Sequence, residues 1–365
     1  MKVGMAVSQR EPCGVGDFAR SLAEAMPDSV EYQLIPYRED DSTSAWRRGA
    51  GAAIGLDLVH VHFEQGLFGA VKPYRNRFAT FVGRLQPPVV VTLHGRLPGL
   101  ASRWRAGRRG ASDILRDLAY LPFFGRWGRI MHGRVAHWIV HSHELFEGVT
   151  AEVGKERTTY LPLPVPKTAR RWSRAEREDL TLVSPGFVKP HKGYDVFAEV
   201  VREVTCSWVV AGGPQDLRDD LHLRELRRQI EESGMGGCVQ ITGYLSRSRM
   251  EENLCRATMA IFPYREVAAS ASMAWAIGCG MPVVSTDLPE FRRLQSLGAG
   301  IELLPRGAPD SWSEIIEGLA HDGERLADLA RRNREFGAAN SFDACAAAHA
   351  EVFERVLREP RDTRG

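Results

Sequence analysis

The sequence predicts an α/β protein made of two domains. Its 365 residues exceed the roughly 250 to 300 residues at which a single hydrophobic core stops growing. Short apolar runs of strand length alternate with amphipathic segments of helix length, which is typical of parallel sheets covered by helices. Three prolines in 161–166 and the charged run 170–179 interrupt this alternation, because proline supports neither a regular helix nor a central strand. We therefore expect two α/β halves with a ligand-binding cleft between them.

Composition and charge exclude several classes of protein. The net charge of +2 creates no overall field that would attract nucleic acid. The six cysteines are scattered without a Cys-x-x-Cys pair, so neither a zinc site nor a disulfide framework is predicted, and a reducing cytoplasm fits best. The run Lys2–Val7 has the length of a strand rather than of a secretory signal, and no stretch approaches about 18 uninterrupted apolar residues. We expect a cytoplasmic protein without a membrane span.

The first predicted strand, Lys2–Val7, is followed by a loop and by a helix from Gly14 to about Met26. Gly14, Gly16 and Ala19 match the glycine pattern of dinucleotide-binding folds. In that pattern the first glycine follows the strand almost at once, whereas six residues intervene here. The spacing argues against a nicotinamide site, and we expect no cofactor. The alternative that we retain is a glycine loop that lets another ligand approach the backbone.

Histidines alternate along the predicted strands of the first half. His60 and His62 would face the same side of a strand at 56–63, and we expect the same of His141 and His143. Alternating histidines can bind zinc, but apart from Glu64 no carboxylate or cysteine stands nearby at a ligand spacing. Packing or polar contacts with substrate are therefore favoured, and we predict no metal site.

His94 stands apart from the other histidines. It follows the apolar run Val89–Leu93 and precedes Gly95, so it lies at the carboxyl end of a predicted strand. In α/β folds this is the position of side chains that contact ligands. His94 is accordingly a candidate site residue.

The segment 96–134 mixes arginines with tryptophan, tyrosine, phenylalanine and leucine. Such a segment can lie on an anionic membrane surface or bind a phosphorylated acceptor. The interpretation that we favour is a solvated helical face whose apolar stripe packs into the core, since such stripes are common in helices of globular proteins. The first alternative predicts peripheral contact with the inner face of a membrane.

The predicted elements of the second half alternate regularly. We expect strands at 180–183, 207–211, 238–242, 260–262 and 282–285, and helices at 194–204, 221–233, 247–257 and 270–277. The loop before the helix at 270–277 joins the end of a parallel strand to a helix N-terminus, which offers unpaired N–H groups to an anion. A phosphate-bearing ligand is one interpretation, and an ordinary helix start capped by serine is the other.

Several segments of the second half resemble the retaining glycosyltransferases of family four, which have the GT-B fold. These segments are Gly186–Gly193, Val209–Pro214, Ile241–Ser246, Phe262–Glu266 and Gly280–Val284. The first half is similar to the same family through its Gly14/Gly16 loop, Asp57–His62 and Thr92–Gly95. The resemblance covers nearly the whole chain and rests on the order and spacing of the segments together.

This resemblance implies two Rossmann-like domains that face each other across a cleft. The acceptor domain would be 1–163, with a C-terminal helix at 342–360 packing back on it, and the nucleotide-sugar donor domain would be 164–341. The implied activity is that of a hexosyltransferase-type glycosyltransferase. It would move a sugar from a nucleotide diphosphate sugar to an acceptor hydroxyl, with retention of anomeric configuration and without a metal. The acceptor would be a small molecule, a glycan or a lipid-linked molecule, and the base and the sugar stay open.

The resemblance also implies roles for single residues. The catalytic pair would be His94, which positions the donor sugar, and Glu266. The donor-binding residues would be Gly14, Gly16, Lys189, Lys192, Gly213, Tyr244, Ser270 and Ser272. Since the leaving diphosphate gathers negative charge, such a transfer needs fixed cations and helix N-termini around it. The alternative for both lysines is exposure in a solvated loop.

The sequence departs from the family at three positions. Phe187 stands where the family usually has an arginine, and Val267 and Trp275 stand where it commonly has two glutamates. Ser270 or Ser272 would then provide hydroxyl groups to the donor. Two alternatives stay open: a nucleotide-sugar epimerase of the same architecture, which would need no acceptor surface, and a non-catalytic subunit that binds a sugar nucleotide, which the missing glutamates favour.

Overall fold

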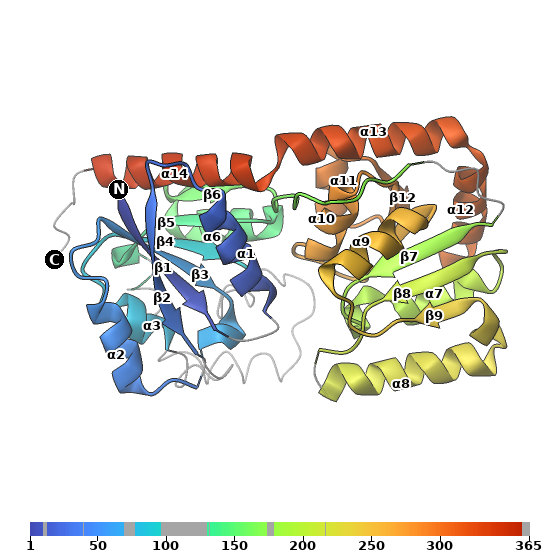
Figure 1. Ribbon diagram of the computed structural model, residues 1–365, viewed down its shortest axis with the longest axis horizontal. Coiled ribbons are helices and arrows are strands. Elements are labelled where there is room, and N and C mark those ends of the chain that lie inside the picture. Colours follow the sequence, from blue (N-terminus) through green and yellow to red (C-terminus); the bar gives the residue numbers. More distant parts are fainter. Residues whose placement is uncertain are drawn as a thin grey trace. The chain divides into compact units, whose positions relative to one another are not determined.

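The computed structural model describes residues 1–9, 13–38, 40–68, 77–95, 130, 132–173, 179–215 and 217–359. The chain divides into two compact units, one of Met1–Pro162 with Phe342–Gly365 and the other of Leu163–Ser341 (Figure 1). Each unit contains a parallel sheet of six strands covered by helices. The prediction of two Rossmann-like α/β domains is thereby confirmed.

The sheet of the N-terminal unit has the strand order β2-β1-β3-β4-β5-β6. Its strands are β1 (Lys2–Ser8), β2 (Glu31–Tyr37), β3 (Leu58–Phe63), β4 (Val89–Leu93), β5 (Val135–Val140) and β6 (Thr158–Tyr160). The described helices are α1 (Gly14–Glu24), α2 (Thr43–Gly51), α3 (Phe78–Val82), α6 (His143–Val153) and α14 (Phe342–Arg358). Strands β3 and β4 are buried along their whole length, which explains why β4 reads as a nearly continuous apolar run.

Helix α14 covers one face of this sheet. Its Ala350, Val352, Phe353 and Val356 form a cluster with Val3, Leu58, Val90 and Ile139. The alternating side chains of the same strands point to the other face, where they pack with residues of α2, α3 and α6. The last helix of the chain therefore completes the core of its first domain.

One predicted element of this unit was wrong. We expected His141 and His143 to face the same side, but β5 ends at Val140 and His143 opens α6. The cause is Ser142, whose Oγ accepts a hydrogen bond from the backbone N–H of Leu145 at 3.2 Å and so caps the helix before a strand can continue.

The sheet of the C-terminal unit has the order β12-β11-β10-β7-β8-β9. Its strands are β7 (Thr181–Pro185), β8 (Ser207–Ala211), β9 (Val239–Ile241), β10 (Met259–Phe262), β11 (Val283–Thr286) and β12 (Ile301–Leu304). The described helices are α7 (Tyr194–Val201), α8 (Leu217–Glu232), α9 (Arg247–Arg256), α10 (Ala271–Gly278), α11 (Pro289–Ser296), α12 (Trp312–His321) and α13 (Gly323–Ala339). A 3-10 helix, η4 (Pro190–Lys192), follows β7.

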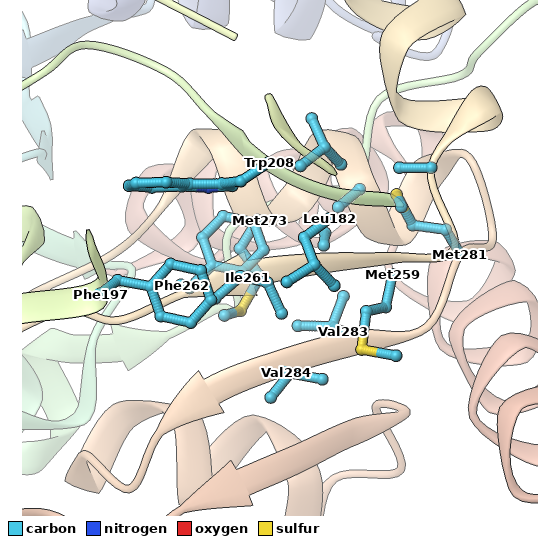
Figure 2. Close-up of a cluster of buried hydrophobic side chains, with 14 of the residues drawn as sticks. Leu182, Phe197, Trp208, Met259, Ile261, Phe262, Met273, Met281, Val283 and Val284 are labelled. Carbon is cyan, nitrogen blue, oxygen red and sulfur yellow. The ribbon is translucent and has the colours of Figure 1, made fainter. Parts of the chain in front are cut away.

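The core of the C-terminal unit fixes the start of α10. Met273, in the first turn of that helix, is 1% exposed and packs with Ile261, Phe262 and Trp208 in one hydrophobic cluster (Figure 2). Because β10 and the first turn of α10 share this core, the loop between them is held at both ends. No helix in the described part of the chain combines the length and the apolar composition that crossing a bilayer requires.

Candidate functional site

The loops that follow β7 and β8 pack closely at the carboxyl edge of the second sheet. A Cβ atom on Gly212 would lie 1.9 Å from the carbonyl oxygen of Gly186, so only glycine fits there. The backbone N–H of Val188 donates to the carbonyl oxygen of Gly213 at 2.9 Å, whereas a Cβ atom on Gly213 would make only ordinary contacts of 3.4 Å or more. Gly212, which we did not predict, is therefore the glycine that the packing requires.

Lys192 places a buried ammonium group at this edge. Its side chain belongs to η4 and the residue is 8% exposed. Nζ donates to the hydroxyl oxygen of Tyr264 at 2.6 Å and to Oγ of Ser272 at 3.4 Å. Among the described residues no carboxylate forms an ion pair with Lys192, whereas Lys189 pairs with Asp219 at 3.8 Å. A buried charge without a counter-charge is costly, so an anion that bound here would offset this cost.

The N-terminus of α10 faces the same ammonium group. Ser270 caps the helix, since its Oγ accepts from the N–H of Met273 at 3.2 Å. Gly186 has a positive φ of 103°, and a Cβ atom there would lie 2.1 Å from Oγ of Ser272 and 3.0 Å from Nζ of Lys192. An ammonium group, two hydroxyls and the free N–H groups of a first helical turn thus converge beside a glycine, as in phosphate-binding sites.

Arg265 ties the two loops of the anion site together. Its guanidinium group donates to both carboxylate oxygens of Asp195, at 2.8 and 2.6 Å, and to the carbonyl oxygen of Pro190 at 2.6 Å. Burial raises the pKa of Asp195, but the hydrogen bonds from Arg265 outweigh it and hold that pKa below its usual value. The ion pair therefore fixes η4, and with it Lys192, against the segment that carries Tyr264.

The other residues of this domain that the sequence analysis named differ in exposure and contacts. Tyr244 is 70% exposed, with its ring centroid 6.3 Å from that of Phe187. Glu266 is exposed. Trp275 packs beneath Arg247, whose guanidinium carbon lies 4.8 Å from the ring centroid. The structure thus brings together Lys192, Ser270 and Ser272, and it gives Lys189 its own carboxylate partner.

In the N-terminal unit, the half-buried His94 packs against the buried imidazoles of His62 and His141. Nε2 of His94 lies 3.0 Å from Nδ1 of His62. The ring of Phe18 packs against His94, His62 and His141, with centroid distances of 4.8, 5.5 and 5.0 Å. Burial, followed by the neighbouring His62, lowers the pKa of His94 well below its usual value. The imidazole of His94 is accordingly neutral near pH 7.

A second chain of hydrogen bonds accounts for His60. The hydroxyl of Tyr32 lies 3.1 Å from Nδ1 of His60, Nε2 of His60 lies 2.7 Å from Oγ1 of Thr92, and Thr92 lies 3.3 Å from Nε2 of His349. Nδ1 of His349 donates to the carbonyl oxygen of Cys345 at 2.7 Å, so Nε2 of His349 accepts a hydrogen bond from Thr92. Each hydroxyl and each imidazole N–H in this series of hydrogen bonds then has one acceptor. His60 is a satisfied core residue. Among the described residues, no three His, Cys, Asp or Glu side chains are placed to hold a metal ion.

The glycines at the start of α1 differ in their surroundings. A Cβ atom on Gly16 would lie 3.2 Å from the carbonyl oxygen of Ser8, while one on Gly14 would meet no atom within 4 Å. Gly16 therefore permits the close packing of α1 on the end of β1. Most of the basic and aromatic segment 96–134, for which membrane contact was one of the two alternatives, lies outside the described residues.

Sequence comparisons identify relatives of part of the chain. Residues 179–322 match the family model described as Glycosyl transferases group 1. The chain is 25% identical over 209 residues to a D-inositol 3-phosphate glycosyltransferase 2 of Catenulispora acidiphila, covering 52% of this chain and 48% of that protein. It is 26% identical over 213 residues to a D-inositol 3-phosphate glycosyltransferase of Xylanimonas cellulosilytica, covering 56% and 50%. The matches thus span about half the length of these relatives.

Solved structures share the fold over almost the whole chain. Anabaena Alr3699/HepE in complex with UDP-glucose superposes with a TM-score of 0.74 at 13% identity, covering 96% of this chain and all of that one. Sucrose-phosphate synthase from Thermosynechococcus elongatus gives a TM-score of 0.73 at 12% identity, covering 98% and 99%. The glycosyltransferase WaaG gives 0.66 at 13%, covering 97% and 99%. The chain therefore has the GT-B fold that the sequence predicted.

Proposed function

We propose that this chain, whose residues 179–322 belong to the Glycosyl transferases group 1 family, is a hexosyltransferase that uses a nucleotide diphosphate sugar. The unit Leu163–Ser341 would bind the donor and the other unit the acceptor hydroxyl. The observation that carries the proposal is the buried ammonium group of Lys192, which has two hydroxyls and a helix N-terminus around it. A structural neighbour of the same fold was solved with UDP-glucose, which supports this class of donor.

The proposed chemistry requires a fixed positive field at the leaving group. As the glycosidic bond breaks, its electron pair passes to the diphosphate oxygen, and Lys192 with the N-terminus of α10 stabilises the charge that develops there. For transfer with retention, the acceptor would attack from the side on which the diphosphate leaves. The departing diphosphate would then take the acceptor's proton. The proposal includes neither a metal nor a cofactor.

We assign further roles to His94 of the N-terminal unit and to Glu266 of the C-terminal unit. A neutral His94 can exchange one hydrogen bond with a sugar hydroxyl, and its place at the end of β4 holds it rigidly. Glu266 would contact the donor sugar after a shift of its loop. We place the reaction in the cytoplasm, which the six free cysteines support, with the acceptor either dissolved or presented at the membrane surface.

Binding of nucleoside diphosphates tests the proposal. Lys192→Ala should weaken the binding of the preferred diphosphate by about 1.5 to 3 kcal/mol, the range for a hydrogen bond to a charged group. A thermal-shift panel of UDP, GDP and ADP with the wild-type protein would first identify that diphosphate. Unchanged affinity in the variant would contradict the assignment of Lys192.

One observation favours a second function. Val267 and Trp275 occupy the two positions at which the resemblance leads one to expect glutamates, and Trp275 is covered by Arg247. This arrangement fits a subunit that binds a sugar nucleotide without turning it over. Binding of the donor without its consumption, in the presence of varied acceptor alcohols, would select this alternative. Conversion of the donor sugar without any acceptor would select an epimerase.

A further inference from the structure

The geometry points to Tyr264 as a positioning residue that makes the anion site donate hydrogen bonds only, and that thereby fits it to an ionised diphosphate. This inference rests on the proposed function and deepens it. Tyr264 is 2% exposed, and its ring packs against Phe262 and Phe291, with centroid distances of 5.6 and 5.7 Å. The phenol group is therefore fixed in place before any ligand binds.

The phenol hydroxyl has a defined direction. Its oxygen accepts from Nζ of Lys192 at 2.6 Å, so its own proton needs a different acceptor because the group is buried. Oγ of Ser270, at 3.3 Å, is the acceptor that the described residues place within reach. Tyr264 consequently donates its hydroxyl proton to Oγ of Ser270, and Ser270 does not donate to Tyr264.

This direction leaves the proton of Ser270 free. A hydroxyl oxygen accepts two hydrogen bonds, and Oγ of Ser270 accepts one from Tyr264 and one from the backbone N–H of Met273. Its own O–H group is then available only as a donor to a ligand. A serine that only capped the helix would have kept one lone pair for the ligand, and such a lone pair would repel a phosphate oxygen.

The ammonium group is oriented in the same way. Lys192 has three N–H groups, of which one is directed to Tyr264 and one to Ser272. The third is left for the ligand, and Ser272, which accepts from Lys192, also keeps its proton free. An ammonium N–H, two hydroxyl protons and the N–H groups of the first turn of α10 thus face the same place. A ligand there must supply acceptors at every contact, as an ionised diphosphate does.

A matched pair of variants tests this role. Tyr264→Phe should weaken binding of the nucleoside diphosphate that the wild-type protein prefers by about ten- to a hundredfold, because Lys192 and Ser270 lose their shared partner. Tyr194→Phe is the control. Tyr194 is also a buried tyrosine of this domain, but its hydroxyl donates to the carbonyl oxygen of Pro185 at 3.3 Å, and among the described residues no hydrogen bond joins it to Lys192. Calorimetry with UDP, GDP and ADP should find this control within about twofold of wild type.

A second variant separates positioning from a general loss of structure. Ser270→Gly removes the hydroxyl while glycine keeps most of the helix cap, and it should also weaken binding. If Tyr264 acts through Ser270, the double variant should lose clearly less than the product of the two single losses. Should Tyr264→Phe fail to fold, Ser270→Gly alone decides, and wild-type affinity in it would overturn the inference.

The outcomes distinguish the inference from the function on which it rests. Equal losses in the two tyrosine variants, or wild-type binding by Tyr264→Phe, would overturn the role of Tyr264 while leaving the diphosphate site in place. The role of Tyr264 would also be overturned if the fold-loss of affinity in the double variant equalled the product of the losses in Tyr264→Phe and Ser270→Gly. A wild-type protein that bound none of the three diphosphates would overturn both.

Discussion

Nδ1 of His62 lies 3.0 Å from Nε2 of His94, and both imidazoles pack against the ring of Phe18. Since burial keeps both rings neutral, a single proton occupies the line between these two nitrogens. His62 thereby fixes the rotation of the His94 ring and decides which of its nitrogens carries a proton. A residue held in this way is suited to positioning a substrate hydroxyl rather than to accepting a proton.

His94→Ala should therefore lower turnover by about tenfold to a thousandfold, the effect of losing a positioning contact. Binding of the bare nucleoside diphosphate should stay nearly intact, because the anion site belongs to the other unit. Single-turnover transfer and calorimetric binding, measured on the same variant, test this prediction. Wild-type turnover, or complete loss of nucleotide binding, would show that His94 does not contact the donor sugar.

Gly186 and Gly298 offer a matched test of the anion site. Both have strongly positive φ angles, 103° and 106°, so alanine should strain the backbone at each by about 1 to 3 kcal/mol. A Cβ atom on Gly186 would collide with Ser272, whereas one on Gly298 would meet no atom within 4 Å. Thermal unfolding should show that both variants are destabilised. Only Gly186→Ala should lose diphosphate binding, and equal binding by the two variants would contradict the site.

The central strands of both sheets could be predicted because they are buried along their length. Val89–Leu93 and Met259–Phe262 are fully buried, and every residue in them except Thr92 is apolar. Strand β2 (Glu31–Tyr37) has one neighbour only, β1, and most of its side chains are exposed. Its mixed sequence, with Pro36, carries no such pattern, and we did not predict it.

The candidate site could be predicted only in part. Ser270 follows from a local pattern, a serine at the start of a helix, and the role of Lys192 was predicted from the resemblance to the glycosyltransferase family. Tyr264 and the ion pair of Arg265 with Asp195 depend on contacts between residues about 70 positions apart in the chain, separations that local spacing does not encode. The position of Tyr264, two residues beyond the end of β10, was the one sequence signal that could have identified it.

The ion pair between Arg265 and Asp195 should affect binding without contacting the ligand. Arg265→Lys loses the bidentate ion pair with Asp195 and the hydrogen bond to Pro190, because the lysine ammonium group is a point charge without the planar fork of a guanidinium group. We expect the affinity for the diphosphate to fall by about threefold to tenfold, because Lys192 is less well placed. Arg292→Lys is the control, as Arg292 forms a similar exposed pair with Asp287 and, among the described residues, has no hydrogen bond to η4 or to Lys192. Equal losses of affinity in the two variants would contradict the positioning role.

Acid should destabilise the N-terminal unit through its buried histidines. Burial lowers the pKa of His349 to about 3, against the opposing effect of its hydrogen bond to the Cys345 carbonyl, whereas an unfolded histidine has a pKa of about 6.5. Above that value both states are neutral, so the stability is then fully present. Between the two pKa values the unfolded chain binds a proton that the folded chain does not, and the free energy of unfolding falls by about 1.4 kcal/mol per pH unit for this residue.

Urea unfolding at about pH 7, 6 and 5 should show a smaller loss of stability in His349→Gln than in wild type. Thr92→Val, which removes the hydrogen-bonded neighbour but no titratable group, should keep the wild-type pH dependence, and a His349→Gln variant with that same dependence would refute the assignment.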